Sequence, residues 1–247
     1  MKVLDRLIEK WFPLGFGTKS PSKTILGVDI SSSAIKLIEM EPSREGFNVI
    51  AYGVEPLPEG VTFDREIVDV AKIAQVLKSV YKKSGARSRN VAVAVSGSSV
   101  ISNYIDLPSS LTSKQMESRI QLEADAIIPF PLEDINLDFA VVGRNAVNKD
   151  EVRVQVVACQ RDYVDRRKEV VQLAGLKPLG VDVETVAFAR AYQTLINAEY
   201  QIPKKQQGLI EKDDVVAIVD IGATQFTFLV LSNQAIIYSV EQPFGGR

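Results

Sequence analysis

Hydrophobic residues recur along the chain with two different periods, which predict alternating strands and helices. Continuous or alternating apolar runs are typical of strands, and apolar residues three to four apart are typical of helices. The first part of the chain therefore predicts strands at 24–30, 34–41, 46–55, 91–97 and 178–183, with helices at 64–83, 162–174 and 184–197. Three consecutive strands followed by helix-covered strands is the order of a ribonuclease-H-like α/β half.

The first of these helices has a distinct apolar face. Gly85 follows its last turn and suits the left-handed conformation that commonly ends a helix. The sequence thus predicts a helix that packs on the sheet and stops at Gly85. The residues predicted on its buried side are Ile67, Val70, Ala71, Ala74, Leu77 and Tyr81.

Residues 99–159 interrupt this order with a strand, a helix and two further strands. We interpret them as an inserted subdomain. Thr112 and Gln115 have the spacing of a capping box at the start of its helix. The motif IIPFPLED then ends the helix and exposes an apolar knuckle, which serves either as a plain terminator or as a binding surface. The predicted strands are 100–107, 135–142 and 151–159, and the predicted helix is 113–128.

A polar linker at 198–214 leads to a third group of strands. Their predicted ranges are 215–221, 226–232 and 235–241. The chain then reaches PFGGR at the point where the first half would begin its first covering helix. Three strands alone cannot bury both faces of a sheet, so we expect residues 215–247 to be the start of a truncated second half.

The strands that open the two halves carry one pattern twice. Residues 25–40, ILGVDISSSAIKLIEM, align without gaps with residues 216–231, VAIVDIGATQFTFLVL, and each places Asp29 or Asp220 before a bend of small residues. Such a bend lets backbone N–H groups and hydroxyls surround a phosphate, while a nearby carboxylate holds hydrated Mg²⁺. Two such bends facing each other would hold a nucleoside triphosphate. The alternative is a pair of ordinary hairpins.

The N-terminal segment of residues 1–23 has a pattern of its own. Apolar and charged residues lie on opposite sides of a helical period over residues 1–12, which predicts a short amphipathic helix. Glycine, serine and proline make the residues after it a tether. Such a helix would lie on a membrane surface, dock on a partner or fold back onto the body.

Composition narrows the chemistry that is open to the chain. Its 247 residues include 29 Lys and Arg against 31 Asp and Glu, and this balance argues against a nucleic-acid partner. It has no histidine, which excludes Ser-His-Asp and Cys-His catalysis and zinc sites built on imidazole. Cys159 is the single cysteine, so an intrachain disulfide is impossible and a reducing compartment fits. Phosphate handling by carboxylates, hydroxyls, backbone and a hard cation remains.

These motifs resemble the superfamily of actin, Hsp70 and FtsA, whose members bind ATP. The residues that carry the resemblance are the GVDIS and IVDIGAT bends, DVETVAFARAY and the terminal PFGGR. IQLEADAIIPFPLEDINLDF and AGLKPLGVDVETVAFARAY are similar to the PilM family of type IV pilus assembly proteins. Over residues 24–247 the resemblance implies an actin-like fold. Subdomain 1A would contain 24–98 and 160–197, the FtsA-type insert 1C would contain 99–159, and 215–247 would begin subdomain 2A.

The resemblance implies ATP and Mg²⁺ as cofactors. Asp29 and Asp220 would hold Mg²⁺ through water, and Glu184 would orient metal-bound water as a catalytic residue. Lys36 would bind phosphate, although on strand alternation it is equally a solvent-facing lysine. The base and ribose pocket would lie beyond Arg247, so we expect the chain as given to bind ATP weakly or not at all. The implied phosphate segments contain Asp29, Ser31, Ser32, Ser33 and Lys36, and Asp220, Gly222, Ala223, Thr224 and Gln225.

The implied function is that of an ATP-binding cytoplasmic adaptor, peripheral at the inner membrane, in pilus biogenesis and twitching motility. It would bind the N-terminal cytoplasmic segment of PilN in a groove between the first actin-like half and the insert, with helix 113–128 and the IIPFPLED knuckle as candidate walls. It would also contact the pilus motor ATPases and touch the membrane indirectly or through its N-terminal helix. ATP hydrolysis would be weak or absent. The alternatives are an FtsA-like membrane-associated filament protein of cell division and a small-molecule kinase of the same fold.

Overall fold

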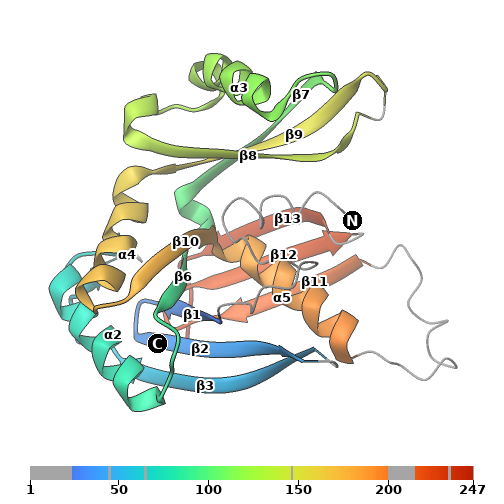
Figure 1. Cartoon of the computed structure of the whole chain (residues 1–247). Coiled ribbons are helices and arrows are strands. Elements are labelled where there is room, and N and C mark those ends of the chain that lie inside the picture. The colour runs from blue at the N-terminus through green and yellow to red at the C-terminus, as the bar shows by residue number, and fades with distance from the viewer. Residues whose placement is uncertain are drawn as a thin grey trace, which may run out of the picture. The chain divides into compact units, whose positions relative to one another are not determined.

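A computed structural model describes residues 24–43, 46–63, 66–145, 147–199, 215–232 and 235–246 (Figure 1). The predicted N-terminal helix and tether lie outside these residues, as does most of the predicted linker. The chain divides into two compact units. One contains residues 98–166, and the other contains the described residues from 24 to 97 and from 167 to 246.

The larger unit is built on a five-stranded sheet with the order β10-β6-β1-β2-β3. The first three strands form an antiparallel meander, and β6 and β10 continue the sheet parallel to β1. This topology confirms the predicted ribonuclease-H-like half. The strands are β1 (Ile25–Ile30), β2 (Ala34–Ser43), β3 (Gly46–Pro56), β6 (Asn90–Val95) and β10 (Lys177–Val183).

Helix α2 (Val70–Ser84) begins later than the predicted start at residue 64. The short pair β4 (Thr62–Phe63) and β5 (Glu66–Ile67) occupies that region instead. The helix then starts after Asp69, whose side chain accepts a hydrogen bond from Lys72 N at 2.9 Å. At the other end, Gly85 has a φ of 72° and caps the helix as predicted.

The later start also corrects the predicted buried face of α2. Ala71 is exposed, whereas Ile73 and Val80 join the core. Tyr81 is partly buried and packs against this core, as predicted. Helix α4 (Arg161–Leu173) contributes to the same core, and α5 (Glu184–Glu199) starts directly after β10 and extends two residues past its predicted end. The core consists mainly of Leu26, Val28, Ile30, Ile35, Leu37, Ile73, Leu77, Val80, Val91, Val93, Val170 and Val171.

The smaller unit is a three-stranded antiparallel sheet with one helix. Its strands are β7 (Val100–Pro108), β8 (Ile135–Arg144) and β9 (Glu151–Gln160), in the order β7-β9-β8. Helix α3 (Ser113–Ile127) has the predicted capping box between Thr112 and Gln115. Met116 and Ile120 of α3 pack on the strands, so the unit has a core of its own.

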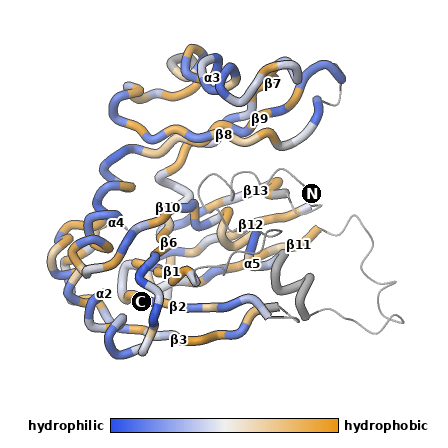
Figure 2. Tube along the Cα trace, viewed as in Figure 1, coloured by the Kyte–Doolittle hydropathy of each residue, from blue (hydrophilic) through white to orange (hydrophobic). Residues whose placement is uncertain are grey.

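A second three-stranded sheet in the larger unit contains β11 (Val215–Ile221), β12 (Phe226–Ser232) and β13 (Ala235–Gln242). On one face, Leu229 and Leu231 are fully buried. Figure 2 shows hydrophobic residues along these strands. The opposite face, here called the outer face, exposes Val219 and Ile221 by 52% and 64%. Aromatic rings of Phe226, Phe228 and Tyr238 contact one another across it.

The gapless repeat shows what distinguishes this outer face from the first sheet. Val28 and Leu37 of the first sheet are buried under α2, and the aligned positions are Val219 and Phe228 of the outer face. The face that α2 covers in the first copy is therefore open in the second, within the part of the chain that the structure describes.

We expect Leu77→Ala to lower the free energy of unfolding by about 2–5 kcal/mol, because Leu77 is fully buried and its truncation leaves a cavity under the sheet. Urea denaturation followed by circular dichroism measures this change. The neighbouring Lys78 is exposed, so Lys78→Ala should change stability by only about 0.5 kcal/mol. Equal losses in both variants would contradict the assigned face.

Candidate functional site

The first predicted phosphate turn connects β1 to β2. Ser31 N donates to the carbonyl oxygen of Ala34 at 3.1 Å, and the Ser31 hydroxyl donates to the same oxygen at 2.9 Å. The neighbouring segment holds the turn from outside, because Leu57 N donates to Ser33 O at 2.9 Å and Thr62 Oγ1 donates to Ser32 O at 3.1 Å. The backbone of this turn is thus fixed by its surroundings.

The second predicted phosphate turn, between β11 and β12, closes in the same way. Gly222 N donates to Gln225 O at 2.8 Å, and in the repeat Gly222 and Gln225 align with Ser31 and Ala34. The terminal glycines cross this turn closely, since Gly246 N donates to Gly222 O at 3.0 Å. A Cβ added to Gly245 would lie 2.4 Å from the carbonyl of Ala223. Only glycine fits at that crossing.

The two turns meet. Thr224 Oγ1 donates to Ser32 Oγ at 2.9 Å, across 192 residues of sequence. Both turns also follow the carboxyl end of a strand, as do Ser96 after β6 and Glu184 after β10. Ligand sites of α/β proteins commonly lie at such strand ends.

The two repeated aspartates have different neighbours. Asp29 lies opposite Lys36 in the ladder, and Lys36 Nζ approaches Asp29 Oδ2 at 3.0 Å in a pair that is about half exposed. Lys36 is therefore both solvent-facing and directed at the first turn's carboxylate. The aligned pair in the second turn is Asp220 with Thr227, and Asp220 is exposed.

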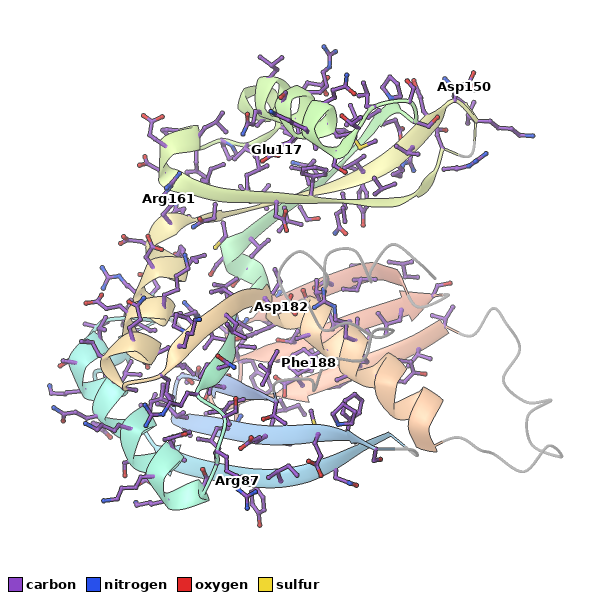
Figure 3. The ribbon with its side chains drawn as sticks, in the orientation of Figure 1. Arg87, Glu117, Asp150, Arg161, Asp182 and Phe188 are labelled. Carbon is purple, nitrogen blue, oxygen red and sulfur yellow. The ribbon has the colours of Figure 1, made fainter. Side chains whose placement is uncertain are left out.

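Glu184 is the first residue of α5, next to a partly buried ion pair. Asp182, at the end of β10 (Figure 3), accepts from Arg190 Nη1 at 2.6 Å and from Val183 N at 2.8 Å. Burial raises the pKa of the Asp182 carboxyl above its usual value, and the charge of Arg190 opposes part of this effect. The pair links the end of β10 to the first turns of α5, and so fixes the segment that carries Glu184.

Sequence reasoning missed the residues that join the second turn to β6. Glu241 Oε2 on β13 accepts from Gln225 Nε2 at 2.5 Å and from Ser96 Oγ at 2.9 Å. Ser96 and Gly97 were predicted as the last residues of the strand at 91–97, whereas β6 ends at Val95 and both residues follow it. Glu241 offered no signal in the sequence, because its contact with Ser96 spans 145 residues.

Comparison with known proteins gives the family. The model of the family described as type IV pilus assembly protein PilM matches residues 27–247. The chain belongs to the PilM family. A solved chain of a PilM-PilN type IV pilus biogenesis complex is 28% identical, with a TM-score of 0.71, over 90% of this chain and 62% of that one. This PilM-family chain thus spans less than two thirds of the length of that relative.

A more distant structure supports the fold alone. The cytoplasmic domain of EpsL, an inner membrane component of the type II secretion system of Vibrio cholerae, is 16% identical with a TM-score of 0.52. The match covers 88% of this chain and 71% of that domain. The predicted actin-like fold of the PilM-family chain is confirmed.

The carboxylates and hydroxyls at the two turns of the PilM-family chain are groups of the kind that bind magnesium and phosphate. Among the described residues, no three His, Cys, Asp or Glu side chains group closely enough to hold a metal ion. Magnesium is usually held by one or two carboxylates, waters and substrate phosphates. Asp29 and Asp220 supply carboxylates of this kind.

None of the helices described has the length and apolar character needed to cross a bilayer.

We expect the stability difference between wild type and Asp182→Asn to depend on pH. Because the folded-state pKa of Asp182 is raised above 3.8, its contribution to stability is present below the unfolded pKa and is lost as pH rises through the folded pKa. The free energy of unfolding of wild type minus that of Asp182→Asn should therefore fall with rising pH in the acid range, as measured by urea denaturation at several pH values.

The same comparison of aspartate with asparagine at position 182 is repeated in the Arg190→Met background. This substitution removes the cation that opposes the burial effect, so the fall with pH should be larger in this background. A difference that stays flat or rises with pH would contradict burial as the main cause.

Proposed function

We propose that this chain is an ATP-binding, actin-like adaptor of type IV pilus assembly, located at the cytoplasmic side of the inner membrane. The family match over residues 27–247 supports the pilus role. The observation that supports nucleotide binding is the hydrogen bond between Thr224 and Ser32, which brings the two repeated turns together.

In this proposal the turns supply the groups that bind the triphosphate. Hydroxyls of Ser32 and Ser33 donate to phosphate oxygens, and those of Ser31 and Thr224 do so by exchanging their present bonds to Ala34 O and Ser32 Oγ. Gly222 lets the backbone approach the phosphate. Lys36 adds positive charge beside the first turn. When bound, Mg²⁺ would be held by Asp29 and Asp220 through water and would neutralise phosphate charge, with Glu184 orienting the water. ATP hydrolysis at this site is weak or absent in this proposal.

Asp29→Ala and Asp220→Ala should each weaken binding of MgATP by about 1–3 kcal/mol, the scale of a lost charge-assisted contact. The loss should be smaller for Asp29→Ala, because it also releases Lys36 from its ion pair. Chemical-shift titration by NMR measures affinities down to the millimolar range and suits a weak site.

The control for this titration is Asp150→Ala, an exposed carboxylate on the loop between β8 and β9 (Figure 3). It should leave the affinity unchanged. Wild-type affinity in both Asp29→Ala and Asp220→Ala would contradict the two-turn site.

We also propose that the chain binds a partner protein of the pilus machinery, PilN. The similar solved chain comes from a complex of PilM with PilN, which supports binding of the N-terminal cytoplasmic segment of PilN here. Two apolar side chains of the smaller unit are available as anchors: Leu122 on α3 is 76% exposed, and Phe130 of the proline knuckle is 37% exposed. Apolar anchors of this kind dominate the affinity of many peptide sites. Contact with pilus motor ATPases belongs to the same proposal.

The double variant Leu122→Ser with Phe130→Ser should bind a labelled N-terminal PilN peptide about tenfold or more weakly, since both side chains are exposed anchors. Fluorescence anisotropy gives the affinity. Gln121→Ser changes the exposed residue next to Leu122 and should bind like wild type. Saturable binding of equal strength in all three proteins would place the peptide elsewhere, and absence of binding by wild type would refute the adaptor role.

A further inference from the structure

Glu241 brings a carboxylate into the proposed phosphate site. Its Oε2 atom accepts hydrogen bonds from Gln225 Nε2 at 2.5 Å and from Ser96 Oγ at 2.9 Å. Gln225 belongs to the second turn and Ser96 follows the carboxyl end of β6. One carboxylate therefore connects the second repeat to the first sheet.

The chain makes room for this carboxylate at Gly97. A Cβ added there would lie 2.5 Å from Glu241 Oε1 and 2.8 Å from Cγ2 of Thr185. Contacts shorter than 3.0 Å are essentially never seen for real Cβ atoms, so the Glu241 carboxylate can occupy its observed position only because residue 97 is glycine. Ser96 and Thr185 are themselves buried.

Glu241 also shares a row with the proposed magnesium-binding aspartate. In the strand register, Asp220 pairs with Thr227 and Thr227 pairs with Glu241, so the three residues lie side by side across β11, β12 and β13. Residues in one such row point to the same face of a sheet, and two strand spacings amount to roughly 10 Å. Asp220 and Glu241 are thus two negative charges on one face of the proposed site.

A carboxylate and a phosphate oxygen compete for the same donors. An ionised carboxylate is an acceptor only, and it forms short charge-assisted bonds with amide and hydroxyl groups, as phosphate does. The Gln225 side chain is a predicted phosphate ligand whose amide donates to Glu241. A phosphate bound at the second turn would have to compete with this hydrogen bond and would be repelled by the negative charge of Glu241.

We propose that Glu241 is an intramolecular competitor of phosphate, which holds Gln225 and Ser96 and thereby lowers the affinity of the site for nucleoside triphosphates. The inference rests on the proposed nucleotide function and adds a residue that sets its affinity. The triphosphate then competes with the Glu241 carboxylate for the Gln225 amide, whose orientation the bond to Glu241 fixes.

The test is Glu241→Gln in the whole 247-residue chain, titrated with MgATP by NMR beside wild type. Glutamine keeps the size of the side chain and removes its charge, so MgATP should bind about tenfold more tightly. Glu169→Gln on the exposed side of α4 removes the same charge away from the turns and should bind like wild type. Thermal unfolding of each variant shows that the fold is retained.

The direction of the change in MgATP affinity shows whether Glu241 competes with phosphate or helps to bind the metal. Weaker binding by Glu241→Gln would overturn the competition and make Glu241 a ligand on the metal side, and equal binding in the two proteins would overturn it as well. If neither wild type nor Glu241→Gln binds MgATP, the nucleotide function is refuted for the chain of 247 residues, and the competition with it. Wild-type binding therefore separates failure of this inference from failure of the proposed function.

A second measurement needs no nucleotide. Glutamine retains an acceptor oxygen but not the charge, so the weaker contacts at this position should speed amide hydrogen exchange of residues 222–226 in Glu241→Gln. Gly97→Ala, which displaces the carboxylate but keeps its charge, should have the same effect, because its new methyl group takes the position next to Oε1. Unchanged exchange in both variants would overturn the contact between Glu241 and the second turn.

Discussion

The hydrogen bond between Thr224 and Ser32 is the contact on which the functional interpretation depends. Each hydroxyl belongs to a turn that is closed by its own backbone hydrogen bond, and the two closing bonds occupy aligned positions of the repeat. Each turn is thus closed by its own backbone, and the long-range bond between Thr224 and Ser32 joins the two turns. An actin-like fold makes such a meeting possible because both turns follow the carboxyl ends of strands.

The groups gathered at this meeting point satisfy one another. Lys36 pairs with Asp29, Thr224 donates to Ser32, and Gln225 donates to Glu241. These groups are thus paired within the protein in the absence of a ligand. The same pairing sets the affinity for any phosphate ligand, because each protein–protein bond must be exchanged for a protein–ligand bond. Binding free energy is then the difference between the protein–protein contacts that are lost and the protein–ligand contacts that form.

Local signals in the sequence were sufficient for most of the fold. The capping box at Thr112, the glycine cap at Gly85 and the apolar alternation of the strands each depend on neighbours within a few residues. Helix α2 was predicted to start too early, because the apolar period continues through Ile67 into a short strand pair that only the structure reveals. The repeat located Asp29 and Asp220. It could not locate Glu241, whose partner Ser96 is distant in sequence, or show that Lys36 turns toward Asp29.

The outer face of β11, β12 and β13 has a consequence for the behaviour of the chain in solution. Val219 and Ile221 present branched side chains to water along a strand at the margin of its sheet, and aromatic rings continue the surface beside them. Exposed hydrophobic edge strands of this kind pair with strands of other molecules and are common sites of aggregation. Handling this protein at high concentration therefore calls for mild detergent, or for a charged residue placed at one of those two positions.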